Sequence, residues 1–194
     1  IEELNGDYFA VLDKGAGEEM QRRIESAARD GDSVGGILES AVIGIPAGVG
    51  EPFFDTVEGV LSHALFAIPG IKGVEFGIGF GGCDLRGSEY NDALVSRDGV
   101  VSTLTNNNGG INGGITNGMP IIFRCAVKPT PSIFKEQQTV NFVTKENVTL
   151  SLRGRHDPAI IHRARAVVDA VTAFTLTDML SARHGTDFFA GEKK

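Results

Sequence analysis

The placement of glycine constrains this chain more than any other feature of its sequence. Glycine makes up 26 of the 194 residues, and 20 of these glycines lie between Gly31 and Gly118. Because glycine has no Cβ atom, it adopts positive φ angles and lets a backbone approach another segment or a ligand closely. The glycines follow no three-residue period, and 7 prolines are too few for collagen. The pattern therefore predicts tight strands and turns over this region.

Composition predicts a folded chain with a buried core. Hydrophobic residues make up 41% and charged residues 22%, which excludes wholesale disorder. No run of 18 apolar residues is present, so we expect no membrane partner. The length favours a single domain. The chain opens on Ile1-Glu2-Glu3 without an initiator methionine or a signal peptide, so we expect a processed chain or a fragment.

The charge is unevenly distributed along the sequence. Residues 1–100 carry 7 basic and 18 acidic side chains, a net −11, whereas residues 101–194 carry 11 basic and 7 acidic, a net +4. The overall charge of −7 argues against nucleic-acid binding. One basic group, here called the Arg/His cluster, is either an anion site or a solvated helix face. It consists of Arg153, Arg155, His156, His162, Arg163 and Arg165.

The numbers and spacing of cysteine and histidine argue against a disulfide framework and a metal site. Cys83 and Cys125 cannot form a disulfide framework, and they fit a reducing, cytoplasmic location. No metal-type spacing joins them or the histidines, so we expect no metal. The Asn147-Val148-Thr149 sequon is interpreted as accidental because no secretory signal precedes it. Nucleophile-elbow, zinc-protease and dinucleotide-binding motifs are absent from the sequence.

Clustered strands beside long helices predict an α+β fold. A helix is predicted over residues 16–29, and a strand over 33–45. A second helix is predicted from an Asp55 N-cap, with Glu58 as capping-box partner, to Pro69-Gly70. Strands are predicted over 73–80 and 121–127, with a loop-rich segment over 81–120 between them. Residues 139–143 are the expected partner of strand 121–127, and 149–152 are a further candidate strand.

The two predicted helices each have an expected apolar face. In the first helix it consists of Met20, Ile24, Ala27 and Ala28. In the second helix it consists of Val57, Val60, Leu61, Ala64 and Leu65.

The last predicted element is a long helix. Asp157 before Pro158 has the pattern of an N-cap followed by a first-turn proline, and Gly185 is the expected C-cap. The apolar stripe of this helix should consist of Ile160, Ile161, Ala164, Val167, Val168, Val171, Phe174 and Leu180.

Several polar segments are candidates for binding or catalysis. The segment 84–92 is polar throughout, and the segment 105–118 combines asparagines with paired glycines. The second of these either cradles a phosphate or a ring edge, or is a flexible turn. Lys128-Pro129-Thr130-Pro131-Ser132 either holds a phosphate or forms a proline-stiffened turn. Residues 154–158 either bind an anion and move a proton through Arg155 and Asp157, or simply cap the long helix.

Seven segments, in order, give the chain its resemblance to a known family. They cover residues 31–36, 44–52, 71–77, 86–88, 106–118, 128–130 and 154–158. Taken together they resemble chorismate synthase, over about residues 30–185. The resemblance implies a β-α-β sandwich fold of which this chain, residues 1–194, is a single C-terminal portion.

The resemblance also implies an activity. The family forms chorismate from 5-enolpyruvylshikimate 3-phosphate by 1,4-elimination of phosphate, in the shikimate pathway of aromatic biosynthesis. It requires reduced FMN, which some members reduce with NADPH, and its members are usually homotetramers. FMN contacts would fall at Pro69, Gly70, Gly113, Arg155 and the segment Lys128-Pro129-Thr130-Pro131-Ser132. Arg155 would also lie near the anionic substrate, and Asp157 would assist proton transfer at the flavin edge.

The chain departs from the family pattern at several positions. Gly70 replaces a commoner alanine, Asn107 a histidine and Ala159 a cysteine, while His162 and Arg165 stand where proline is frequent. By the resemblance, the two catalytic histidines of the family belong to its N-terminal half. We therefore expect this chain alone to be inactive. The alternative is a non-catalytic core or oligomerisation module that folds without binding flavin.

Overall fold

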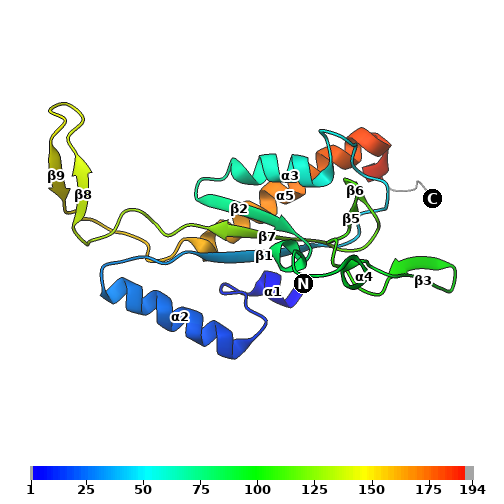
Figure 1. The fold of residues 1–194 in the computed structure, drawn as a ribbon, viewed down its shortest axis with the longest axis horizontal. Coiled ribbons are helices and arrows are strands. Elements are labelled where there is room, and N and C mark those ends of the chain that lie inside the picture. The colour runs from blue at the N-terminus through cyan, green and yellow to red at the C-terminus, as the bar shows by residue number, and fades with distance from the viewer. Residues whose placement is uncertain (1, 191–194) are drawn as a thin grey trace. The chain divides into compact units, whose positions relative to one another are not determined.

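A computed structural model describes residues 2–190 of the chain. It divides into two compact units. The first unit joins Ile1–Gly36 to Val127–Ala164, and the second joins Ile37–Ala126 to Arg165–Lys194. Figure 1 shows helices and short sheets together, as the predicted α+β class requires.

A three-stranded sheet with the order β1-β7-β2 organises the second unit. Its strands are β1 (Gly36–Val42), β7 (Ile121–Val127) and β2 (Ile71–Phe76). The predicted strand over 121–127 is confirmed: Ile121, Phe123 and Cys125 alternate along β7 and are fully buried. The predicted strands over 33–45 and 73–80 are both shorter in the structure.

Helix α3 (Val57–Phe66) packs against β2, as Figure 1 shows. Val57, Leu61 and Leu65 recur every four residues and are fully buried, which confirms the predicted apolar face. The predicted N-cap at Asp55 is wrong by one residue. Thr56 caps the helix instead, since its hydroxyl accepts a 3.0 Å hydrogen bond from the Gly59 N–H.

The segment 81–120 contains more regular structure than the sequence predicts. The 3-10 helix η1 (Gly79–Gly82) and the short helix α4 (Gly87–Tyr90) precede the hairpin of β3 (Leu94–Arg97) and β4 (Val100–Thr103). A second hairpin joins β5 (Ile111–Asn112) to β6 (Ile115–Thr116). Asp98-Gly99 and Gly113-Gly114 turn these hairpins with positive φ at both residues, as type I′ turns require.

Helix α5 (Ile161–His184) is followed by the 3-10 helix η2 (Thr186–Ala190). The predicted start at Asp157-Pro158 is wrong, because the helix begins at Ile161. Val168 and Leu180 are buried as predicted, but Val167 and Phe174 are exposed, Phe174 by 79%. The buried stripe also includes Thr172, Thr175 and Leu176. The predicted C-cap is confirmed: Gly185 has φ 77°, and its N–H donates to the Ser181 carbonyl at 2.8 Å.

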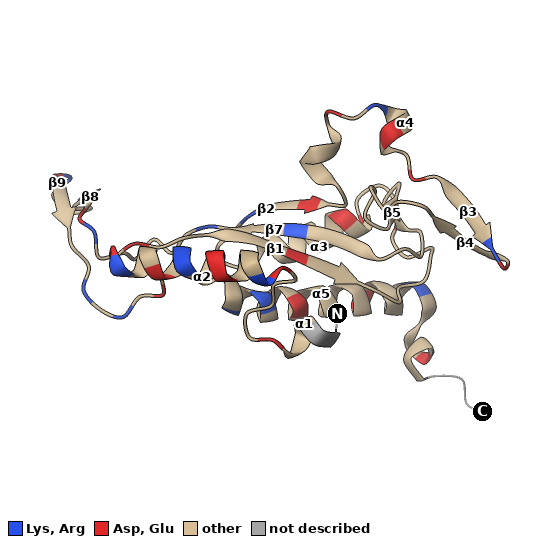
Figure 2. Cartoon of the chain, turned by 90° about the horizontal axis from the view of Figure 1, so that it is seen from below, with Lys and Arg blue, Asp and Glu red and all other residues tan. Residues whose placement is uncertain are grey.

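In the first unit, α1 (Glu2–Gly6) precedes α2 (Lys14–Arg29). The predicted helix over 16–29 is confirmed, although it begins two residues earlier, at an Asp13 N-cap whose carboxylate accepts from the Ala16 N–H at 2.9 Å. Two residues of its expected apolar face, Met20 and Ala28, are exposed. Helix α2 contains both acidic and basic residues, coloured red and blue in Figure 2.

The strands β8 (Gln137–Val140) and β9 (Asn147–Leu150) form an antiparallel hairpin in the first unit. The expected pairing of residues 139–143 with strand 121–127 is therefore wrong. β7 is the central strand of its sheet and pairs with β1 on one side and β2 on the other, so no edge is left for residues 139–143. Within residues 2–190, no helix combines the length and the hydropathy needed to span a membrane.

Candidate functional site

Three of the motif segments named above meet in the first unit. The Ser33 hydroxyl donates to the Thr130 carbonyl at 2.6 Å, and the Val34 N–H donates to the Pro158 carbonyl at 2.8 Å. At Gly35, a Cβ atom would lie 3.0 Å from Pro129, so the close approach requires glycine. Segments 31–36, 128–132 and 154–158 are thus brought together by backbone contacts.

An ion pair reinforces this convergence. The Lys135 ammonium lies 2.8 Å from the Asp32 carboxylate, and the Ser33 N–H donates to the same carboxylate at 2.9 Å. The hydrogen bonds from Lys135 and Ser33 lower the pKa of Asp32 below its usual value. The first turn after α2 is therefore held to the chain around residue 135.

Lys128-Pro129-Thr130-Pro131-Ser132 follows the end of β7. Lys128, Pro129 and Pro131 are exposed, while Thr130 and Ser132 are half-buried. Among the described residues, no carboxylate forms an ion pair with Lys128, and the buried Thr130 hydroxyl has no hydrogen-bond partner. A cation and an unsatisfied hydroxyl therefore stand two residues apart.

The Asp157 carboxylate does not cap α5. It is half-exposed and pairs with the guanidinium of Arg163, in the first turn of that helix. The helix starts later because the Ile160 carbonyl accepts the first helical hydrogen bond, from the Ala164 N–H at 2.9 Å. Arg163 is a contact of Asp157 that the sequence did not predict; its i+6 spacing matches no pattern of a regular helix.

The Arg/His cluster separates into groups with different partners. Arg163 pairs with Asp157, Arg165 lies 3.8 Å from Asp169, and the His162 ring lies 5.5 Å from the Tyr8 ring. Arg153 and Arg155 are both exposed, and no described carboxylate forms an ion pair with either. The capacity of the cluster to bind an anion therefore resides chiefly in these two arginines.

The side chain of His156, between Arg155 and Asp157 in the sequence, packs against Phe134. Its ring packs edge-on to Phe134 at 4.7 Å and lines a cavity of about 50 Å³. Its Nε2 atom is buried without a hydrogen-bond partner among the described residues. Ser132 and Pro158 line the same small cavity, so it adjoins two of the candidate segments.

Two other predicted contact positions belong to the second unit and lie in a turn. Pro69 and Gly70 are its central residues, because the Ile71 N–H donates to the Ile68 carbonyl at 3.3 Å. Gly70 has φ 98°, which a residue with a Cβ adopts only with strain. An alanine at this position would be strained in this conformation.

Gly113, also in the second unit, begins the two-residue turn of the β5–β6 hairpin. Its φ is 60°, and a Cβ atom there would meet nothing within 4 Å. The backbone at this position is therefore open to the approach of another molecule.

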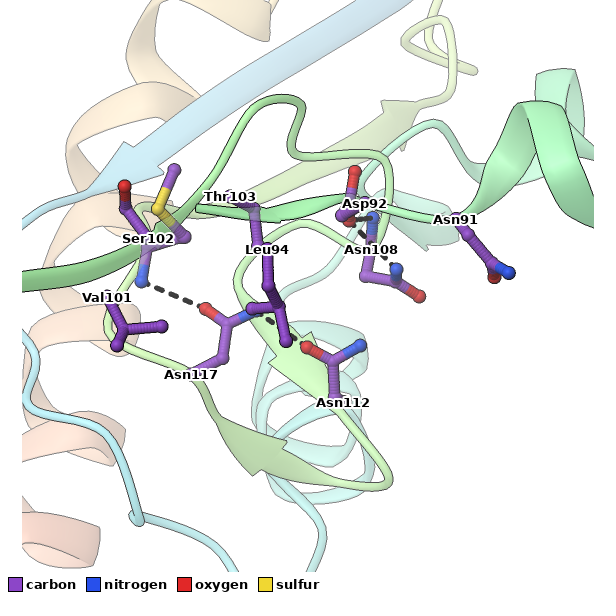
Figure 3. Close-up of a pocket in the computed structure, with 10 residues that line it drawn as sticks. Asn91, Asp92, Leu94, Val101, Ser102, Thr103, Asn108, Asn112 and Asn117 are labelled. Carbon is purple, nitrogen blue, oxygen red and sulfur yellow. Dashed lines mark hydrogen bonds between the residues drawn. The ribbon is translucent and has the colours of Figure 1, made fainter. Parts of the chain in front are cut away.

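The polar segment 105–108 is ordered rather than flexible, since Asp92 holds it. The Asp92 carboxylate accepts from the Thr105 hydroxyl at 2.6 Å and from the Asn107 N–H at 2.7 Å. It also accepts from the Asn108 N–H at 2.9 Å and from the Asn108 side chain at 2.8 Å, the contact drawn in Figure 3. The sequence analysis missed this role of Asp92, because no short-range pattern links it to residues 13 to 16 positions later.

A cavity of about 370 Å³ adjoins this network (Figure 3). Its amide groups are largely paired with one another: Asn117 donates to Asn112 at 2.6 Å and accepts from the Met119 N–H at 2.9 Å. Asparagine pairing of this kind stabilises the loops around the cavity. No group of three metal-ligating side chains occurs among residues 2–190.

Comparison with known proteins decides the family. A family model described as chorismate synthase matches residues 2–181. This chain belongs to the chorismate synthase family. The chorismate synthase of Pyrococcus abyssi is 53% identical over 171 residues, which are 88% of this chain and 48% of that protein. The one from Dehalococcoides mccartyi (strain BAV1) is 51% identical over 167 residues, or 86% of this chain and 46% of that protein.

The fold agrees with the family. A solved crystal structure of chorismate synthase aligns with 89% of this chain and 45% of that chain, with a TM-score of 0.71 and 31% identity. The predicted α+β fold of the chorismate synthase type is therefore confirmed. The chain spans about half the length of the curated relatives it matches.

Proposed function

We propose that this chain supplies the C-terminal half of an FMN-dependent chorismate synthase. The reaction would be the 1,4-elimination of phosphate from 5-enolpyruvylshikimate 3-phosphate. Family membership and the order of the seven motif segments support this role. The observation that carries it is the meeting of segments 31–36, 128–132 and 154–158. Among the described residues, this arrangement leaves the exposed Lys128 and Arg155 without an ion pair and the buried Thr130 hydroxyl without a hydrogen-bond partner.

Residues in each unit, taken separately, offer groups that suit one part of FMN. Its phosphate requires cations and hydroxyl donors, which Lys128, Thr130 and Arg155 offer. Its ring edge requires hydrogen-bonding groups at close range, and the open backbone at Gly113 permits such an approach. When bound in reduced form, FMN supplies an electron-rich ring with a nitrogen that can accept a proton.

Arg155 and Asp157 would have distinct roles. The guanidinium of Arg155 presents a planar set of donors, which suits the phosphate or carboxylate groups of the substrate. Asp157 would assist the transfer of the substrate proton. The carboxylate pairs with Arg163, so it lies beside a cation at the start of α5.

We further propose that the chain alone does not turn over substrate. The resemblance assigns the two catalytic histidines of the family to the half that this chain does not match. Here His156 is packed against Phe134, and His162 lies beside Tyr8. A cytoplasmic location, a homotetramer and reduction of the flavin by NADPH remain predictions that rest on the resemblance.

A non-catalytic assembly module is the second candidate. The observation that favours it is the exposure of large apolar side chains in the second unit: Phe54 is 92% exposed, Phe53 89% and Phe174 79%. Large apolar side chains exposed in this way are frequent at binding interfaces. A module of this type would self-associate without binding flavin, so a flavin titration separates the two candidates.

The test uses a reconstituted complex: this chain mixed with the separately produced part of the Pyrococcus abyssi relative that it does not match. The dissociation constant (Kd) for FMN is measured by flavin fluorescence. Replacing Arg155 by alanine should raise Kd about 10- to 100-fold, since a charge-assisted hydrogen bond contributes about 1.5–3 kcal/mol. Arg29→Ala is the matched control, because that exposed arginine in the last turn of α2 belongs to none of the candidate segments; its Kd should change less than twofold. Equal Kd values for the two variants would contradict the proposal.

A further inference from the structure

The second unit contains a carboxylate that is surrounded by hydrogen-bond donors. Asp92 lies between α4 and β3 and is half-buried. Both of its oxygens are occupied: Oδ1 accepts from Thr105 and Asn107, and Oδ2 accepts twice from Asn108. No ion pair to Asp92 is found among the described residues. All four of these hydrogen bonds come from residues 105–108.

The electrostatics favour the ionised form of this carboxyl group. Partial burial acts to raise the pKa of Asp92, but the hydrogen bonds from Thr105, Asn108 and Asn107 outweigh it and lower the pKa below its usual value. A carboxylate can accept all four hydrogen bonds, whereas a neutral amide or carboxylic acid cannot. The arrangement therefore requires a negative charge at this position.

The segment that Asp92 holds also contacts Gly77 and Ile78, the two residues that follow β2. The Ile78 N–H donates to the Asn107 carbonyl at 2.8 Å. A Cβ atom at Gly77 would lie 2.6 Å from the Gly109 nitrogen and would also overlap the Asn107 carbonyl oxygen. The turn at 106–110 thus has contacts on two sides and little freedom to shift.

This turn is joined to the hairpin that carries Gly113. The Asn106 side chain bridges the turn, as it accepts from the Gly110 N–H and donates to the Pro120 carbonyl, both at 2.8 Å. The Asn117 N–H, just after β6, donates to the Gly110 carbonyl at 2.9 Å. A continuous set of hydrogen bonds therefore connects Asp92 to the β5–β6 hairpin.

We infer that Asp92 is a positioning residue for the flavin contact at Gly113, acting through the turn at 106–110. This inference rests on the proposed function, since that function makes Gly113 a flavin contact. Asp92 itself does not touch the flavin. Its loss should weaken flavin binding without changing the chemistry of the flavin once it is bound.

The test compares Asp92→Asn with Asp98→Asn in the reconstituted complex defined above. Both substitutions remove one negative charge from the second unit. Asp98 is exposed in the β3–β4 turn at φ 53°, a conformation that asparagine tolerates well. In Asp92→Asn, the new amide group would face the donors of Asn108 instead of accepting from them.

Three readouts are expected to agree. Asp92→Asn should raise Kd for FMN at least tenfold, and it should speed amide hydrogen exchange at Asn107 and Asn108 at least tenfold. At saturating FMN, kcat should return to within twofold of the wild-type value, because excess FMN fills a weakened site and Asp92 does not touch the reacting atoms. Asp98→Asn should change Kd and exchange less than twofold.

Other outcomes would overturn the inference. An Asp92→Asn complex with Kd within twofold of wild type, or with kcat still depressed at saturating FMN, refutes it while the proposed function stands. A wild-type complex that does not bind FMN refutes the proposed function, and the inference with it. If Asp92→Asn does not fold, Thr105→Val decides, because it removes one donor only. That variant should raise Kd about threefold, and an unchanged Kd refutes the inference.

Discussion

Alanine at Gly77 and alanine at Gly113 should have very different effects on stability. The two glycines have nearly the same backbone conformation, with φ 56° and 60°. A Cβ atom at Gly113 meets nothing within 4 Å, whereas one at Gly77 lies 2.6 Å from the Gly109 nitrogen and overlaps the Asn107 carbonyl. The comparison therefore separates the cost of the left-handed conformation from the cost of the steric clash.

The loss of stability expected for each substitution follows from the surroundings of the added Cβ atom. The left-handed conformation costs a residue with a Cβ about 1–2 kcal/mol, partly offset by about 0.4–1 kcal/mol from the less flexible unfolded chain. Gly113→Ala should therefore lower the free energy of unfolding by about 1 kcal/mol. Gly77→Ala adds about 1–3 kcal/mol of overpacking against backbone, and it disturbs the 2.8 Å hydrogen bond from Ile78 to Asn107.

Thermal unfolding followed by circular dichroism measures the difference. For a chain of this length, 1 kcal/mol corresponds to about 2–4 °C in Tm. Gly113→Ala should thus lower Tm by about 2–4 °C, and Gly77→Ala, at about 2–4 kcal/mol, by roughly 4–16 °C. Gly44→Ala is a second control, since its φ is 81° and a Cβ atom there meets nothing within 4 Å. Equal Tm shifts for Gly77→Ala and Gly113→Ala would refute the close packing of β2 on the 106–110 turn.

Three further predictions concern other features of the second unit. Arg124→Met should lower the free energy of unfolding by about 1–3 kcal/mol in urea titrations, because it leaves the partly buried Glu75 carboxylate without its 2.9 Å partner; an unchanged midpoint would count against that ion pair. The folded-state pKa of Asp92 is lowered, so its contribution to stability is fully present above the unfolded-state pKa of about 3.9 and is lost as the pH falls through the folded value. Urea titrations should therefore show a smaller loss of stability between pH 5 and pH 3 for Asp92→Asn than for wild type, and parallel losses would contradict this. In the folded chain, a thiol reagent should modify the exposed Cys83 but spare Cys125, since burial raises the pKa of the Cys125 thiol to about 11; equal labelling rates would show that β7 is not buried.

Local patterns in the sequence predicted those elements whose structure is determined locally. The apolar spacing of Val57, Leu61 and Leu65 predicted the buried face of α3, and the apolar run over 121–127 predicted β7. Gly185 predicted the end of α5, because only the last turn and a left-handed residue are needed there. The Asp98-Gly99 pair was also a local signal, for the β3–β4 hairpin, and it was overlooked.

The remaining errors depend on the partners that individual side chains find in the folded chain. Asp157-Pro158 has the pattern of a helix start, but Arg163 holds the Asp157 carboxylate and the helix begins at Ile161. Phe174 has the right spacing for the core, yet Thr175 is buried instead, where its hydroxyl donates to the Val171 carbonyl at 2.8 Å. Such outcomes depend on side-chain partners that spacing alone does not reveal.

The candidate site was predicted better in its composition than in its geometry. The order of the motif segments predicted which segments matter, and three of them meet in the first unit. The sequence did not predict the pairing of Asp157 with Arg163 or the role of Asp92, because both depend on how the chain is folded. The contacts of Pro69, Gly70 and Gly113 with flavin remain predictions.

Formation of chorismate is the most direct test of the central claim, that this chain is one half of an FMN-dependent chorismate synthase. The chain alone and the reconstituted complex are each supplied with 5-enolpyruvylshikimate 3-phosphate and reduced FMN under anaerobic conditions. We predict no chorismate from the chain alone and steady turnover by the complex. Turnover by the chain alone would contradict the assignment of essential groups to the other half, and an inactive complex would contradict the proposed function itself.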